Sequence, residues 1–143
     1  MNKYGMIFHH LGLAVTHPDK AINFLRGLGY RVGDRLYDEH QNVYLIYCEH
    51  ASMPDVELIY RAESPGPLDN ILRNFSEVVY HICYTCSDLQ STLDKIRQEN
   101  RLITVSAPNP APLFNNLKVS FYKVAGYGLI EILEDKKQPF DKE

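Results

Sequence analysis

The chain repeats one arrangement of polar residues within apolar runs, and this repeat limits the folds open to it. His10 and His81 each stand in an apolar run, and about fifty residues later Glu57 and Glu131 each interrupt another one. A buried glutamate is costly unless a cation or a hydrogen-bond donor satisfies it. Self-similarity at a fixed spacing indicates that one structural unit is used twice.

Each half has the residue pattern of a strand, a helix and three further strands. The expected strands of the first half lie near 8–15, 30–37, 43–49 and 55–61. Those of the second half lie near 79–86, 101–105, 117–124 and 128–134. The pattern predicts an α+β fold of two tandem βαβββ modules.

Capping patterns mark where each helix begins and ends. Thr16 and Ser87 each have a suitable partner three positions on, the spacing of a capping box, so both are predicted helix caps. Gly29 fits a left-handed helix stop. Residues 107–112, rich in proline, predict a loop between two strands.

The predicted plan is a single domain over 1–143. Its parts are a first module at 7–61, a linker with a short helix at 62–77, and a second module at 78–134. The linker combines turn residues with Leu68, Ile71, Leu72 and Phe75 at helical spacing.

Composition excludes several classes of partner. The net charge of −3 offers no basic stripe for nucleic acid or an anionic membrane. No apolar run reaches the roughly 20 residues of a spanning helix, and the first residues lack a secretory signal, so a cytoplasmic location is expected. Three irregularly spaced cysteines fit a reducing compartment, and Cys83 and Cys86 are expected to be buried apolar residues.

Strand alternation predicts which side chains meet. His10 shares a face with Gly12 and Ala14, which leave room above the sheet. If the sheets of both halves curl toward each other, His10, Glu57, His81 and Glu131 converge. Two imidazoles and two carboxylates without a thiolate suit a divalent metal such as Ni, Co, Mn, Zn or Fe. Taken singly, a strand histidine is more often a core residue and a glutamate is usually solvated on an outer face, so the prediction rests on their joint placement in both halves.

The chain resembles the vicinal oxygen chelate superfamily, which includes glyoxalase I, methylmalonyl-CoA epimerase, extradiol dioxygenases and bleomycin-resistance proteins. The matching segments are 10–15, 56–60, 81–84 and 129–133. The resemblance implies paired modules in a cupped mixed sheet around a metal, with His10, Glu57, His81 and Glu131 as ligands and a small-molecule substrate. A homodimer is also expected, since members of the superfamily often pair and exposed strand edges favour association.

Three functions fit such a cup. The first is an enzyme that stabilises an enolate while a proton moves next to a carbonyl, in an acyl thioester or a hemithioacetal. The second is an Fe(II) extradiol dioxygenase, which a fourth ligand at Glu57 disfavours. The third is a non-catalytic binding protein of the antibiotic-resistance type, with Tyr44, Tyr84 and Tyr122 lining the cup. Retention of all the ligands disfavours this binding protein, so a metal-dependent epimerase, isomerase or glyoxalase-like lyase is predicted.

The linker resembles that of the epimerases. At the position of the epimerases' catalytic glutamate, however, this chain has a different residue. His40 stands there, with Glu39 beside it. Glu131 is therefore the first candidate for proton transfer, and His40 the second. Residues 110–116, with Phe114 as an apolar contact, are expected to form either a substrate wall or a surface connection.

Overall fold

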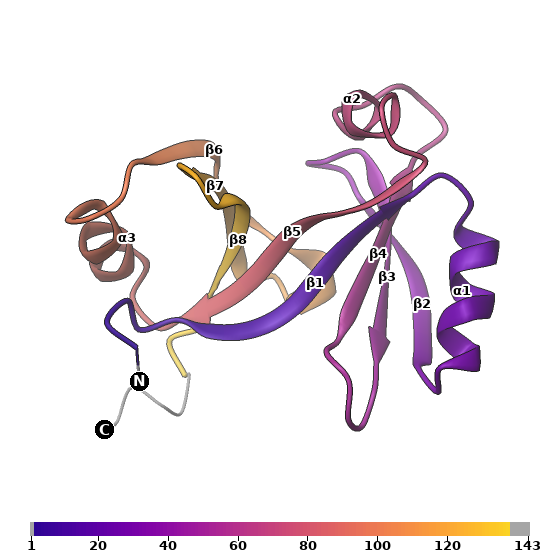
Figure 1. Ribbon diagram of the computed structural model, residues 1–143, viewed down its shortest axis with the longest axis horizontal. Coiled ribbons are helices and arrows are strands. Elements are labelled where there is room, and N and C mark those ends of the chain that lie inside the picture. Colours follow the sequence, from indigo (N-terminus) through magenta and orange to yellow (C-terminus); the bar gives the residue numbers. More distant parts are fainter. Residues whose placement is uncertain (1, 138–143) are drawn as a thin grey trace. The chain divides into compact units, whose positions relative to one another are not determined.

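A computed structural model describes residues 2–137, and in this range the chain forms eight strands and three α-helices (Figure 1). The elements are β1 (Ile7–Val15), α1 (Pro18–Gly27), β2 (Arg31–Asp38), β3 (Val43–Glu49), β4 (Val56–Arg61), α2 (Leu68–Leu72), β5 (Glu77–Cys86), α3 (Leu89–Arg97), β6 (Leu102–Pro110), the 3₁₀ helix η1 (Pro112–Phe114), β7 (Lys118–Val124) and β8 (Gly128–Glu134). The order βαβββ occurs twice, and parallel and antiparallel strand pairs are mixed. The predicted α+β class is confirmed. Within 2–137, no helix has the length and apolar character needed to cross a bilayer.

The described chain divides into two compact units. The first unit comprises residues 10–80, and the second comprises residues 2–9 together with 81–137. The division falls inside β1 and inside β5, so the chain's first residues fold with its second half. Each unit has its own apolar core.

In the first unit the strand order is β2-β3-β4-β1, with β1 parallel to β4 and the other neighbours antiparallel. Helix α1 lies alongside these strands (Figure 1). Its buried Leu25 joins Val15, Ile46 and Leu58 in one cluster. The side chains of Val15, Ile46 and Leu58 therefore point toward the helix, and the residues next to them along each strand point to the opposite face.

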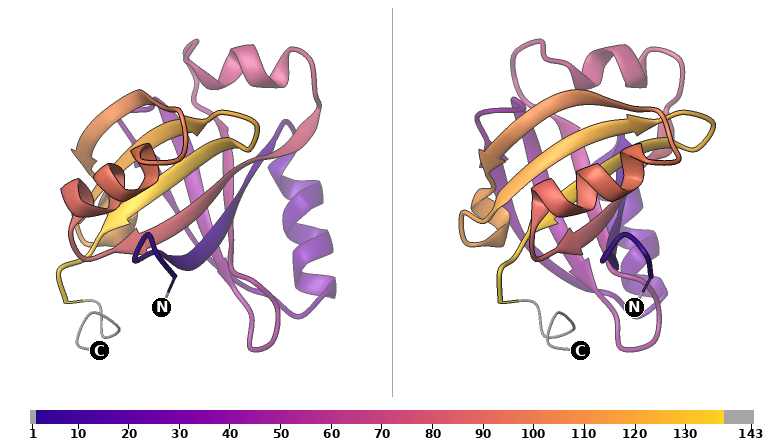
Figure 2. Two further views of the ribbon diagram at one scale, coloured as in Figure 1. Left: turned by 60° about the vertical axis from the view of Figure 1, so that its left-hand side comes forward. Right: turned by 90° about the vertical axis from the view of Figure 1, so that its left-hand side faces the viewer.

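The second unit repeats this arrangement in the order β5-β8-β7-β6, with β5 parallel to β8. Helix α3 lies across one face of the sheet (Figure 2). Leu93 and Ile96 of the helix pack with Tyr122, Ile130 and Ile132 of the strands. The apolar side of α3 therefore faces the sheet.

Both predicted helix caps are wrong by one residue. The N-cap of α1 is His17, whose side chain makes no capping hydrogen bond. Thr16 instead donates from Oγ1 to the carbonyl of Ser76, 2.7 Å away. The N-cap of α3 is Asp88, which follows the predicted Ser87 and accepts a hydrogen bond from the backbone N–H of Ser91 at 3.0 Å. The two halves remain equivalent, because each observed N-cap lies one residue after the predicted one.

The predicted stop at Gly29 is confirmed. Gly29 adopts φ +97°, a left-handed conformation that side chains disfavour. The next N–H, of Tyr30, donates back to the carbonyl of Leu25 at 3.0 Å, which closes the last turn.

Two predicted boundaries differ in extent. Strand β6 continues through Pro108 to Pro110, where a loop was predicted. Proline is tolerated because β6 is an edge strand, paired on one side with β7, and its register shifts twice along the pair. In the linker, helix α2 ends at Leu72, and Phe75 is exposed.

Candidate metal centre

In the first unit, a histidine and a glutamate lie side by side on the sheet face opposite α1. Leu13 and Val15 pack on the α1 side, so His10 points to the other face. Glu57 lies there too, because its register partner on β1 is Gly12, two residues beyond His10. The distance from His10 Nε2 to Glu57 Oε1 is 3.7 Å, and both residues are buried.

The second unit builds the same pair in the same way. Glu131 of β8 is in register with Cys83, two residues beyond His81 on β5. His81 Nε2 lies 3.2 Å from Glu131 Oε1, and both residues are buried. The flanking Ile130 and Ile132 belong to the core under α3, which fixes the pair on the opposite face.

An aromatic ring contacts each histidine edge-on. Tyr47 of β3 lies 5.6 Å from His10 between ring centres, at 87°. Phe121 of β7 lies 5.4 Å from His81, at 79°. Tyr47 and Phe121 are the register partners of Glu57 and Glu131, respectively. Sequence reasoning missed both rings, although each stands the same number of residues before its glutamate.

Each unit therefore offers one imidazole and one carboxylate, both buried, as candidate metal ligands. Nitrogen and oxygen donors without a thiolate are typical of sites for divalent transition metals. The edge-on rings restrict the orientation of each imidazole. The donor chemistry of these four residues fits a divalent cation.

The second candidate for proton transfer lies apart from any strand. His40 and Glu39 are exposed in the turn between β2 and β3. Buried Asp38 holds this turn by accepting hydrogen bonds from the N–H groups of His40 and Gln41 at 3.0 and 3.2 Å. A role for His40 in catalysis stays a prediction.

Residues 110–116 form a closed turn. The N–H groups of Phe114 and Asn116 both donate to the carbonyl of Ala111, at 3.0 and 2.9 Å. Phe114 packs on a cluster that contains Cys83 and Leu133, on the sheet face that carries His81 and Glu131. Its ring also meets His9 edge-on at 5.3 Å. This placement allows Phe114 to form a wall beside Glu131. Contact of Phe114 with a substrate stays a prediction.

The three tyrosines expected to line the cup do not share the face of the histidines. Tyr84 and Tyr122 belong to the core under α3. Tyr44 is three residues before Tyr47 on β3, so the two side chains point to opposite faces of the sheet. Tyr44 is the register partner of Tyr60, which packs on the α1 side. Their hydroxyl groups therefore cannot serve the binding role predicted for that cup.

A family model described as the glyoxalase/bleomycin resistance protein/dioxygenase superfamily matches residues 9–121, most of the chain. The chain belongs to this superfamily. The family predicted from the repeated histidines and glutamates is thereby confirmed. No curated protein matches the chain.

Solved structures support the superfamily fold. Methylmalonyl-CoA epimerase from Mycobacterium tuberculosis matches with a TM-score of 0.74 at 21% identity, over 89% of this chain and 86% of that one. A hypothetical protein from Bacillus halodurans C-125 gives 0.78 at 20% identity, over 93% and 96%. A Streptomyces coelicolor methylmalonyl-CoA epimerase variant in complex with 2-nitronate-propionyl-CoA gives 0.70 at 19%, over 90% and 96%. At these identities the likeness establishes the fold.

Proposed function

We propose that this protein is a divalent-metal-dependent enzyme that moves a proton next to the carbonyl of an acyl thioester. The observation that carries the proposal is the buried histidine–glutamate pair, built by the same strand register in both units.

The proposed metal ligands are His10, Glu57, His81 and Glu131. Burying two carboxylates is unfavourable unless positive charge compensates them, and a divalent cation supplies that charge. When bound, the cation would stabilise negative charge that develops on a carbonyl oxygen. We propose that the metal is Ni, Co, Mn, Zn or Fe, which this donor set suits.

The proton would be accepted by a carboxylate of the site. Glu131 is the first candidate, because β8 holds it buried beside His81. A carboxylate placed next to the reacting carbon would act as the general base for its proton. His40 is the second candidate, since an imidazole accepts protons near neutral pH.

The ligands of the solved neighbours support an acyl thioester as the proposed substrate class. One of them is a methylmalonyl-CoA epimerase in complex with methylmalonyl-CoA and NH4+. Another holds 2-nitronate-propionyl-CoA. Hemithioacetals, the substrates of glyoxalase-type lyases, are the alternative that the test must include.

Deuterium exchange tests the proposed reaction directly. In D₂O, the metal-loaded protein should place deuterium on the carbon beside the carbonyl of acyl thioesters, detected by mass spectrometry across a panel that includes hemithioacetals. Glu131→Gln should slow exchange by about 10²-fold or more, whereas the same change at exposed Glu99 should have little effect. His40→Asn measures the second candidate.

Two results would contradict the proposal. Exchange that is absent with every member of the panel would remove proton transfer as the reaction. Protein purified without added metal that contains no ion, and takes up none on titration, would favour the binding-protein function instead.

A further inference from the structure

The second unit contains a cavity that the proposed function does not use. It has a volume of about 520 Å³, within the range of small-molecule sites. On β5 and β8 it is lined by Tyr84 and Ile130, which stand on the α3 side of the sheet. His81 and Glu131 point to the opposite face of the same strands. The cavity is therefore separate from that pair.

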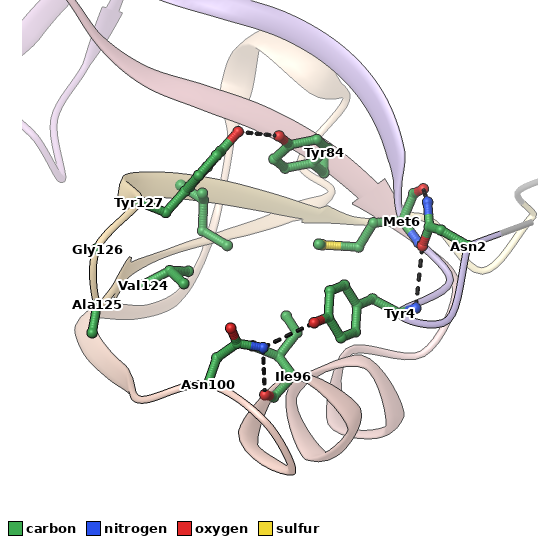
Figure 3. Close-up of a pocket in the computed structure, with 11 residues that line it drawn as sticks. Asn2, Tyr4, Met6, Tyr84, Ile96, Asn100, Val124, Ala125, Gly126 and Tyr127 are labelled. Carbon is green, nitrogen blue, oxygen red and sulfur yellow. Dashed lines mark hydrogen bonds between the residues drawn. The ribbon is translucent and has the colours of Figure 1, made fainter.

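The chemistry of the lining restricts the ligand. Eleven residues line the cavity (Figure 3), and none of these described residues is charged: Asn2, Tyr4, Met6, Tyr84, Ile96, Asn100, Val124, Ala125, Gly126, Tyr127 and Ile130. An anion would find no cationic side chain there and a cation no carboxylate, which favours an uncharged ligand. Rings and aliphatic side chains on several sides suit a flat apolar body.

A pair of phenol groups supplies one polar contact. The hydroxyl oxygens of Tyr84 and Tyr127 lie 2.7 Å apart at one end of the cavity (Figure 3). Two hydroxyls carry two protons, and their mutual bond uses one, which leaves the other for an acceptor. Burial, followed by the hydrogen bond to Tyr127, raises the pKa of Tyr84, so its hydroxyl keeps its proton at neutral pH.

The opposite end is held in place by the chain's first residues. Asn100 donates from Nδ2 to the Tyr4 hydroxyl at 2.9 Å, and Thr92 donates from Oγ1 to the Tyr4 carbonyl at 2.8 Å. Asn2 Oδ1 accepts from the N–H groups of Tyr4 and Met6 at 3.2 and 3.1 Å. This wall is therefore formed before a ligand arrives, which lowers the entropy cost of binding.

We propose that this cavity is a second binding site, for an uncharged, flat, largely apolar small molecule with one hydrogen-bond acceptor. The acceptor would meet the Tyr84–Tyr127 hydroxyl pair, and the apolar body would lie against Met6, Val124 and Ile130. The site works without the metal and without the proposed reaction.

Binding of 6-propionyl-2-dimethylaminonaphthalene, a neutral naphthalene with a ketone acceptor, tests the proposal. Its fluorescence should shift to the blue and saturate at one molecule per chain, equally with and without EDTA. The anionic 8-anilinonaphthalene-1-sulfonate should bind at least tenfold more weakly. Absence of saturable binding of the neutral probe would overturn the proposal.

Variants locate the probe. The double substitution Tyr84→Phe with Tyr127→Phe should weaken binding about fivefold, the effect of one lost hydrogen bond. Tyr37→Phe in the first unit, which removes a hydroxyl bonded to Asn42, is the matched control and should not change affinity. Val124→Trp should abolish binding by filling the cavity.

Ala125→Trp, at an exposed position on the rim, is the second blocking variant if Val124→Trp fails to fold. Unchanged affinity in a folded blocking variant would place the probe elsewhere and overturn the proposal. A second result would also overturn the proposal: the protein is a dimer, a blocking variant dissociates it, and the neutral probe does not bind. A second copy of the chain, and not a small molecule, would then occupy this surface.

Discussion

Tyr47 and Phe121 occupy equivalent places in the two units and differ by one hydroxyl group. The Tyr47 hydroxyl donates to Asp55 Oδ2 at 2.7 Å, which ties its ring to the residue before β4. Phe121 has no hydroxyl and is held by its buried packing, which includes the edge-on contact with His81. The two rings should therefore respond differently to substitution.

Removing the ring of Phe121 should affect both stability and metal binding. Phe121→Ala is expected to lower the free energy of unfolding by about 3 kcal/mol, through lost burial and the cavity left behind. It should also weaken metal binding, because His81 loses the ring that restricts its orientation. Tyr47→Phe keeps the ring and should cost about 1 kcal/mol, with metal content unchanged. Urea unfolding and metal titration measure the two effects, and a metal affinity unaltered in Phe121→Ala would contradict the positioning role.

Burial also controls the chemistry of Cys48. It raises the pKa of this thiol from 9.0 to about 11, since a thiolate is poorly solvated in the core. A raised pKa in the folded state means that the contribution of this group to stability is complete below pH 9 and declines as the pH rises toward 11.

The thiols should accordingly resist alkylation. Cys48, Cys83 and Cys86 are all buried. In the folded protein at pH 8, iodoacetamide should label none of them within the time that labels all three in urea, as read by mass spectrometry. Rapid labelling of Cys48 in the folded state would contradict its burial.

At the scale of elements, the two helices begin in different ways on the same frame. The first turn of α3 is satisfied by the Asp88 cap and by Glu134 Oε2 of β8, which accepts from the N–H of Leu89 at 2.8 Å. Both carboxylates also interact favourably with the positive end of the helix dipole. Helix α1 has Pro18 in its first turn, where a missing N–H needs no partner.

Neighbouring alanine substitutions should separate the true cap of α3 from the one the sequence suggested. Asp88→Ala should lower the free energy of unfolding by about 1 kcal/mol, the usual effect of losing an N-cap. Ser87→Ala, one residue earlier, should change it by less than about 0.5 kcal/mol. Urea unfolding of both variants measures the difference. Equal losses of unfolding free energy in the two variants would contradict Asp88 as the sole cap of α3.

At the scale of the whole molecule, duplication makes the proposed metal stoichiometry informative. If one ion binds all four ligands, His10→Ala and His81→Ala should each reduce metal content from about one ion per chain toward none. If each unit held its own ion, the protein would contain about two ions and each variant would retain one. Elemental analysis distinguishes these outcomes, and thermal unfolding with and without metal should show that the ion stabilises the folded chain. A single variant that keeps half of the metal would contradict a shared site.

The sequence allowed the βαβββ order, the family and both histidine–glutamate pairs to be predicted, because each depends on local patterns. Strand alternation assigns a side chain to a face, as with His10 beside Gly12 and Ala14. Equal spacing in the two halves then marks equivalent positions. Tyr47 and Phe121 also stand at the same spacing before Glu57 and Glu131, so this equivalence is visible in the sequence too.

Other features depend on contacts between distant segments, which no local pattern records. Thr16 has the residue type and the spacing of a helix cap, yet its hydroxyl donates to the carbonyl of Ser76 instead. Pro108 and Pro110 predict a loop, yet they are tolerated in β6 because an edge strand leaves one side unpaired.

By itself, the sequence determined the duplicated α+β framework and the superfamily, and it singled out the two histidine–glutamate pairs that we propose as metal ligands. Only the tertiary structure decided that the first residues fold with the second half, where Thr92 and Asn100 hold Tyr4 and a cavity opens between them and β8. The physical reason is range: periodicity acts between neighbours along the chain, whereas a cavity and its hydrogen bonds join residues nearly a hundred positions apart.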